Sequence, residues 1–96
     1  MTALMSDFAA SIADNNLRPT ARFSVHARAD PGVMPRVLEL FAKRGLVPSR
    51  WESATFGDDD SELTIDIQTR GLRRETVEYI AACLRQIVFV KVVLTL

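Results

Sequence analysis

The sequence predicts an α+β fold, in which four strands form one antiparallel sheet and two helices cover one of its faces. Two segments alternate apolar and polar residues with the period of a half-buried strand, and two longer segments repeat apolar residues at helical spacing. The chain also contains one less regular strand-like segment and a final apolar, β-branched run. Together these segments follow the order βαββαβ, which is typical of a two-layer sandwich.

Composition limits the class of protein and its partners. The 96 residues suffice for one small domain, and the 48% apolar content is typical of a folded globular protein. Twelve basic and twelve acidic side chains cancel, so we expect neither nucleic acid nor a membrane as a partner. The lone Cys83 allows no internal disulfide, and neither a secretion signal nor a spanning run is evident. We therefore expect a cytoplasmic protein.

The N-terminal segment is polar and precedes the first strand. Residues 1–20 are predicted to be a flexible arm, because paired asparagines and Pro19 interrupt any helix there, while residues 21–96 form the domain. The stretch "ARFSVHAR" then alternates apolar and polar residues, which predicts a strand over residues 21–28.

The stretch "DPGVMPRVLELFAKRG" predicts a helix with clear boundaries. Asp30 fits the N-cap, and Pro31 fits the first helical position, where a missing N–H costs nothing. Gly45 fits the end of the helix. Met34 and Leu38 widen its apolar stripe. The stripe itself consists of Val33, Val37, Leu40 and Phe41.

The second half of the chain predicts a hairpin, a helix and a last strand. Residues 46–56 are predicted as an edge strand, because Pro48 cannot donate a ladder hydrogen bond. "GDDDS" forms the turn to an alternating strand over residues 62–69. A helix follows Gly71, and a strand over residues 88–96 closes the order. The apolar face of that helix consists of Val77, Ile80, Ala81, Leu84 and Ile87.

This order predicts a ferredoxin-like sandwich in which one face of the sheet stays open. The last strand is apolar on both of its sides, and we expect Phe89 and Val93 on one of them. The other side is expected to carry Val90, Val92, Leu94 and Leu96. Small domains often cover such surfaces by pairing, so a homodimer is expected.

Several functions of βαββαβ domains are excluded by missing motifs. An RNA-recognition motif needs aromatic residues on its central strands, and "ELTIDIQT" has none. A metal carrier would need a CxxC in its first loop, and an acylphosphatase-like enzyme would need an Arg-bearing, glycine-rich loop there. Because no catalytic set is evident, we expect neither an enzyme nor a bound cofactor.

Isolated polar residues have simple structural interpretations. His26 could act as a base, but no partner motif surrounds it, so a position on the sheet face is expected. Cys83 is expected to be a small buried residue of the second helix. Asp58, Asp59 and Asp60 lack the ligand spacing of a Ca²⁺-binding loop and are expected to form a solvated turn. No metal site is predicted.

The stretch "ADPGVMPRVLELFAKRGLVPSRW" resembles the opening of ACT domains. In these domains a strand is followed by a Pro-Gly or Ser-Gly pair, a helix of the form RVxxLFxxRG, and a second strand. The resemblance continues through Leu96. Within the ACT family the chain is similar to the regulatory small subunits of acetolactate synthase (acetohydroxyacid synthase), in their single-domain isozyme II type. The features in common are "ARF" in the first strand, Pro directly after Asp, and "RVL" in the helix.

The resemblance implies an amino-acid effector site in the loop before the first helix, usually across a dimer interface. The residues that it implies are Ala29, Asp30, Gly32, Val33 and Met34. A glycine there lets a ligand approach backbone N–H groups, although Gly32 could instead only ease tight packing. In ligand-binding ACT domains the position of Ala29 usually carries Asp or Asn, which holds the amino group of the effector. An effector is therefore expected to bind weakly or not at all.

The resemblance also implies a non-catalytic, activating small subunit of acetolactate synthase in branched-chain amino-acid biosynthesis. Thiamine diphosphate, Mg²⁺ and flavin would then belong to the large catalytic subunit. Arg50 and Trp51 are candidate residues for the partner interface, because both types are enriched at binding hot spots, although Trp51 could equally be a core residue. The alternative is a free-standing ACT homodimer that senses an amino acid, such as a branched-chain one, and regulates another enzyme or regulator.

Overall fold

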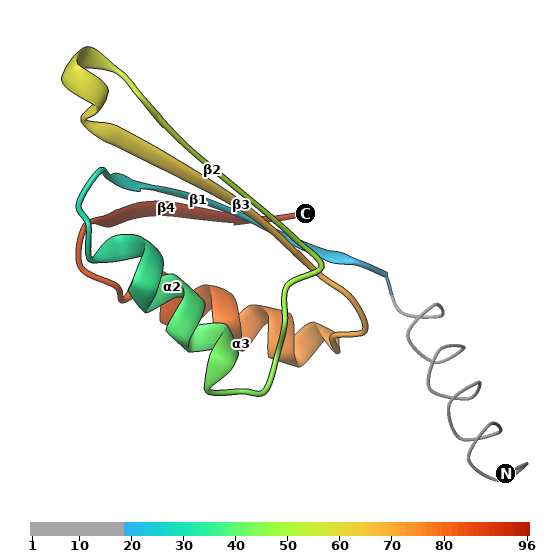
Figure 1. The fold of residues 1–96 in the computed structure, drawn as a ribbon. Coiled ribbons are helices and arrows are strands. Elements are labelled where there is room, and N and C mark those ends of the chain that lie inside the picture. Colours follow the sequence, from blue (N-terminus) through green and yellow to red (C-terminus); the bar gives the residue numbers. More distant parts are fainter. Residues whose placement is uncertain (1–18) are drawn as a thin grey trace, which may run out of the picture.

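The computed structural model describes residues 19–96, which form a four-stranded antiparallel sheet with two helices on one face (Figure 1). The strand order is β2-β3-β1-β4, so the predicted ferredoxin-like sandwich is confirmed. Of the expected N-terminal arm, residues 1–18 lie outside the described residues. The elements are β1 (Ala21–Arg28), α2 (Val33–Ala42), β2 (Arg50–Phe56), the short 3₁₀ helix η1 (Asp58–Asp60), β3 (Glu62–Thr69), α3 (Arg74–Arg85) and β4 (Val90–Thr95).

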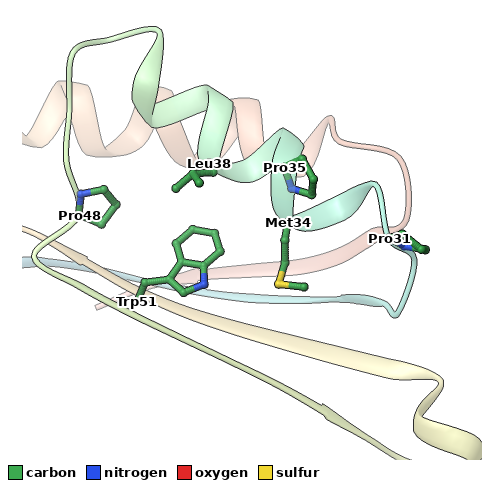
Figure 2. A pocket seen from close by; sticks show the side chains of 6 residues that line it. All are labelled: Pro31, Met34, Pro35, Leu38, Pro48 and Trp51. Carbon is green, nitrogen blue, oxygen red and sulfur yellow. The ribbon is translucent and has the colours of Figure 1, made fainter.

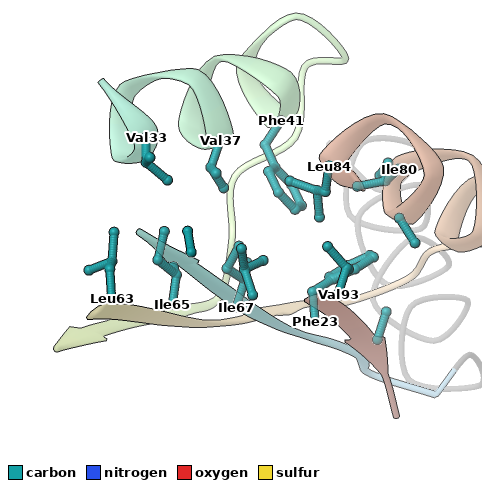
Figure 3. Close-up of a cluster of buried hydrophobic side chains, with 14 of the residues drawn as sticks. Phe23, Val33, Val37, Phe41, Leu63, Ile65, Ile67, Ile80, Leu84 and Val93 are labelled. Carbon is teal, nitrogen blue, oxygen red and sulfur yellow. The ribbon is translucent and has the colours of Figure 1, made fainter. Parts of the chain in front are cut away.

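The core lies between the two helices and the two central strands, β1 and β3 (Figure 3). Both strands follow the alternation read from the sequence, so that every second side chain is buried against the helices. Phe23 of β1 and Phe41 of α2 pack edge to face, with ring centroids 5.7 Å apart. The largest fully buried side chains are Phe23, Phe41, Ile65, Ile67, Ile80, Leu84, Val25, Val33 and Val37.

Helix α2 begins two residues later than expected. Asp30 is not the N-cap, because its carboxylate accepts a hydrogen bond from the Gly32 N–H, at 2.9 Å, within the preceding turn. Pro31 therefore lies in that turn, and Gly32 is the N-cap. The predicted end is confirmed: Gly45 has a positive φ of 67°, and the hydrogen bond from the Leu46 N–H to the Phe41 carbonyl closes a Schellman motif.

Strand β2 lies at an edge of the sheet, as predicted, but it begins at Arg50, so Pro48 precedes it in a loop. Its residues on the helix side face a region that the helices leave largely uncovered: Trp51 is half-buried, while Ser53 and Thr55 are exposed. Neither helix in residues 19–96 has the length and apolar character needed to cross a membrane.

Strand β4 begins at Val90, two residues later than expected, and it contains a bulge. Val92 pairs with His26 and Val90 pairs with Ala27, so Lys91 is an extra residue. The expected division of faces is therefore wrong at Val90, which packs against the core on the same side as Val93. It is also wrong at Phe89, which lies before the strand with a positive φ of 76° and is 40% exposed.

A polar network ties three strands together on the open face of the sheet. The Glu62 carboxylate accepts hydrogen bonds from His26 Nε2, at 2.8 Å, and from Lys91 Nζ, at 2.8 and 2.9 Å. The His26 ring also lies beside Phe56, with ring centroids 5.3 Å apart. His26 is thus a residue of the sheet face, as expected, and the bulge places Lys91 where it reaches Glu62.

The first prediction concerns Thr69, which is only 2% exposed and whose hydroxyl has no hydrogen-bond partner among the described residues. Thr69→Val keeps the shape of the side chain and removes the unpaired polar group, so it should raise the free energy of unfolding by about 1 kcal/mol. Urea denaturation measures this change. As a control, Thr69→Ser keeps the hydroxyl, loses a buried methyl group and should lower the stability. A less stable Thr69→Val variant would show that the hydroxyl has a hydrogen-bond partner.

The second prediction concerns Glu62. The hydrogen bond from Lys91, and then that from His26, hold the pKa of the Glu62 carboxyl below its ordinary value of 4.5. A lowered pKa in the folded state stabilises the fold above the unfolded value, and this stabilisation is lost as the pH falls through the folded value. Glu62→Gln should therefore be less stable than the parent chain near neutral pH, and the difference should shrink in acid.

Urea denaturation of both chains at about pH 7 and about pH 3 measures this difference. Asp58→Asn, which changes an exposed carboxylate in the η1 turn, is the control and should show little effect. A loss of stability in Glu62→Gln that is the same at both pH values would contradict the role assigned to the charge.

Candidate functional site

An apolar groove of about 650 Å³ lies between helix α2 and the edge strand β2 (Figure 2). We call it the α2 groove. Helix α2 turns Val33, Val37 and Phe41 toward the core. The apolar residues beside them on the helix have no strand side chains packed tightly against them, and this leaves the groove open. Met34 and Leu38 on that side remain 38% and 49% exposed. The groove is lined by Pro31, Met34, Pro35, Leu38, Pro48 and Trp51.

The loop before α2 uses most of its own backbone donors. The Gly32 N–H donates to the Asp30 carboxylate, and the Val33 N–H donates to the Asp30 carbonyl at 3.1 Å. Pro35 has no N–H to offer. The first turn of a helix lacks intrahelical acceptors, so Met34 has the remaining N–H of this turn, and no acceptor for it is found in residues 19–96.

Gly32 has an ordinary right-handed conformation, with φ −80° and ψ −11°, so the turn does not require a glycine for its backbone angles. A side chain at this position would instead displace the ends of two neighbouring flexible side chains, those of Arg36 and Asp30. A Cβ at this position would lie 2.3 Å from Arg36 Nη1 and 3.1 Å from Asp30 Oδ2. The Arg36 guanidinium in turn donates to the Gly32 carbonyl at 3.2 Å. Close packing by neighbouring side chains is thus visible at Gly32.

The same loop is fixed to the sheet on two sides. The Ala29 N–H donates to the Ser61 carbonyl, and the Arg28 N–H donates to the Phe89 carbonyl, both at 2.9 Å. The Arg28 guanidinium also lies 5.5 Å from the centre of the Phe89 ring. A positive φ is unusual for a bulky residue such as Phe89, so this junction holds a conformation that isolated chains avoid. The loop therefore presents a fixed surface.

The structure brings together only part of the effector set inferred from the sequence. Val33 is fully buried and points into the core, and Ala29 is partly buried against the core. The Asp30 carboxylate is engaged by the Gly32 N–H. Of the five residues, Met34 is the one whose side chain lines the α2 groove.

The two candidate residues of the partner interface lie on opposite faces of β2. Trp51 pairs with Ile67 and faces the α2 groove, whereas Arg50 pairs with Gln68 on the open face, where it forms an ion pair with Glu52. They therefore do not form one surface. The sequence does not mark Pro35 and Pro48 as residues of a site, and it indicates Leu38 only as part of a widened apolar stripe. The wide apolar stripe was the available signal for a groove, because a stripe that is wider than the core can cover leaves some of its apolar residues exposed.

The remaining polar candidates have structural surroundings. Cys83 is half-buried rather than buried, and its Sγ lies 3.9 Å from Arg44 Nη2. The Arg44 guanidinium also lies over the Tyr79 ring, 4.6 Å from its centre. The three aspartates of η1 are exposed, and no cluster of His, Cys, Asp or Glu in residues 19–96 could hold a metal ion.

The chemistry of the α2 groove suits an apolar group. All six lining residues are apolar or aromatic, so no side chain that lines the groove would hold an ammonium group. The Met34 N–H lies at the positive end of the α2 dipole, where a carboxylate is favoured. The site can therefore hold an apolar side chain of a partner, or a small molecule that combines an apolar part with a carboxylate.

Comparisons with known proteins identify the family. The family model described as "ACT-like domain" matches residues 14–95. No curated protein sequence matches the chain significantly. Among solved structures, the chain is similar to the ACT domain of GTP pyrophosphokinase from Chlorobium tepidum, with a TM-score of 0.69 and 13% identity over 82% of this chain and 99% of that one.

The C-terminal domain of the MgtC protein from Mycobacterium tuberculosis gives a TM-score of 0.66 and 14% identity, over 82% of this chain and 86% of that one. The regulatory subunit of aspartate kinase from Thermus thermophilus, in a ligand-free form, gives a TM-score of 0.63 and 12% identity. In that case the match covers 80% of this chain and half of the other. At such identities the solved structures show the fold, whereas the family model covers most of the sequence. The chain therefore belongs to the ACT-like domain family, whose members are generally regulatory, amino-acid-sensing domains that commonly dimerise.

Proposed function

We propose that this chain is a non-catalytic small subunit that activates acetolactate synthase in branched-chain amino-acid biosynthesis, and that the large catalytic subunit docks an apolar segment in the α2 groove. One observation carries the proposal: the groove is exposed and wholly apolar, and none of the side chains that line it could hold an ammonium group. Such a surface favours a protein partner over a free zwitterion. The choice of enzyme rests on the resemblance in "RVLELFAKRG" and the adjoining segments.

The proposed mechanism is a population shift. Docking favours the catalytically competent arrangement of the large subunit, because the groove binds that arrangement more tightly than the others. Trp51 and Leu38 are the proposed anchors, since they face each other across the groove (Figure 2). Thiamine diphosphate, Mg²⁺ and flavin belong to the partner, and this chain supplies only binding energy.

A second candidate is a free-standing homodimer that senses a branched-chain amino acid and regulates another enzyme or regulator. The Met34 N–H favours it, because this donor lies beside the apolar groove and has no acceptor in the described part of the chain. An amino-acid carboxylate would accept from Met34, while an aliphatic side chain would fill the groove. Ala29 weakens this candidate, because it leaves the ammonium group without a carboxylate partner.

The third prediction tests the activating subunit. The tagged chain is used to capture proteins from its own cell extract, and acetolactate synthase activity is assayed in the captured material before and after more chain is added. Leu38→Asp places a charge in the α2 groove and should weaken activation about tenfold or more, as expected for an interface anchor. Tyr79→Asp is the matched control, because Tyr79 is a similarly exposed apolar residue of α3 outside the groove.

Three results would contradict this assignment. Capture without any acetolactate synthase activity would exclude the proposed partner. Equal activation by the parent chain and Leu38→Asp would exclude the groove as the docking surface. An equal loss in Tyr79→Asp would show that the effect is not specific to the groove. Circular dichroism of each variant first establishes that it is folded.

The fourth prediction tests the sensor. Thermal denaturation is followed with each of the twenty amino acids, and a ligand of the native state at a hundredfold its Kd adds about 2.7 kcal/mol of stability. If the second candidate is correct, only valine, leucine or isoleucine should raise the melting temperature, and Leu38→Asp should abolish the increase. For an activating subunit without an effector site, none of the twenty should have an effect.

A further inference from the structure

A second groove lies at the opposite end of the helical layer, where α3 begins. It has a volume of about 480 Å³, within the range of about 300–1,000 Å³ typical of binding pockets. We call it the α3 groove. It shares no residue with the α2 groove. Its lining residues are Pro19, Thr20, Ala21, Leu72, Arg73, Arg74, Glu75, Val77 and Leu96.

The α3 groove has an apolar floor and a positive rim. Leu72 is buried, Val77 is half-buried, and Leu96 is 76% exposed, so the groove offers apolar surface that the described residues do not cover. Arg73 is the N-cap of α3 and makes no side-chain hydrogen bond to the helix, whose positive dipole end therefore faces this region. Among residues 19–96, Arg74 forms an exposed ion pair with Glu78, at 3.3 Å.

The chain itself enters the α3 groove. Pro19 and Thr20, the first two residues that the structure describes, line it. Residues 1–17 contain two acidic side chains, Asp7 and Asp14, and no lysine or arginine. Within the same segment, Leu4, Phe8 and Ile12 follow one another at intervals of four residues, the spacing of one helical face. The family match begins only at residue 14, so this apolar run precedes it.

We propose that the segment 4–14 docks in the α3 groove of its own chain. Its apolar residues cover Leu72, Val77 and Leu96, and Asp14 lies beside Arg73 at the start of α3. The charges are complementary, because the segment is acidic while the rim carries two arginines and one glutamate. The reach is sufficient: the four residues 15–18 span up to about 14 Å when extended, and Pro19 already lies in the groove.

The segment 4–14 has an advantage over other possible occupants of the α3 groove, because it belongs to the same chain as the groove. A tether of four residues holds the segment near the groove at an effective concentration in the millimolar range, so even a weak interaction is populated. A second copy of the chain has the same segment and the same groove, but it lacks this advantage at ordinary protein concentrations. The proposal is independent of the proposed function, because the α2 groove takes no part in it.

Paramagnetic relaxation in the full-length chain tests the proposal. A nitroxide is attached to Ser11→Cys in a Cys83→Ser background, so that the label has a single position, and amide signals are recorded. Strong broadening is expected at residues 72–77 and at Leu96, with none at residues 33–38 of α2. No broadening at residues 72–77, or broadening at residues 33–38 instead, would overturn the proposal.

A mixed sample separates docking within one chain from exchange between copies. The nitroxide is placed on chains of natural isotope abundance, which are mixed with ¹⁵N-labelled chains that carry no nitroxide. Docking within the chain predicts no broadening in this sample. Broadening at residues 72–77 would show that the segment docks on a second copy, and would overturn the proposal in its stated form.

Charge reversal tests the contact with Arg73. Asp14→Lys and Arg73→Glu should each reduce the docked population about two- to fivefold, as expected for an exposed ion pair, and the double variant should recover part of the loss. Asp59→Lys in the η1 turn is the control and should change nothing. Unchanged broadening in Asp14→Lys would contradict the proposed contact.

A further measurement uses chains without the cysteine substitutions, so that effects of these substitutions on folding cannot change the result. Amide chemical shifts of the parent chain are compared with those of a chain that lacks residues 2–13. The differences should be confined to the lining of the α3 groove. Spectra that coincide throughout residues 19–96 would overturn the proposal.

Discussion

The position of α2 on the sheet is the constraint on which the other surfaces depend. Val33, Val37 and Phe41 dock on the central strands, and the Asp30 turn and the Gly45 cap fix both ends of the helix. The right-handed twist of a sheet turns an edge strand away from a helix that packs on the centre. Strand β2 is consequently left with exposed residues on its helix side, and the α2 groove opens beside it.

The elements predicted best from the sequence are the strands in which apolar and polar residues alternate without interruption. The bounds of β1 and β3 match, because each has one buried and one polar face. The start of α2 was missed because Asp-Pro-Gly fits a cap and a preceding turn equally well. The bulge in β4 was missed for a different reason: Val90, Val92, Val93 and Leu94 are all apolar, so no alternation reveals which of them faces the core.

The candidate site could be predicted only in part, since a groove depends on contacts between distant segments. Met34 was found from the loop sequence, but the contributions of Pro35 and Pro48 depend on how α2 lies over β2. The solved ACT domain of GTP pyrophosphokinase and the regulatory subunit of aspartate kinase have this fold at 13% and 12% identity. Because one fold can carry many different functions, the ligand and the partner are determined by the residues at its surface sites and not by the fold itself.

The bulge in β4 also determines what the deletion of one residue from this strand would do. Val90 and Val93 face the core on either side of the extra residue, and Lys91 projects from the other face. Removing residue 91 would restore a regular strand without moving any core side chain to the opposite face, and only the contact with Glu62 would be lost. In most strands a deletion of one residue reverses every side chain beyond it. At position 91 the strand can therefore lose a residue while every core side chain keeps its side of the sheet.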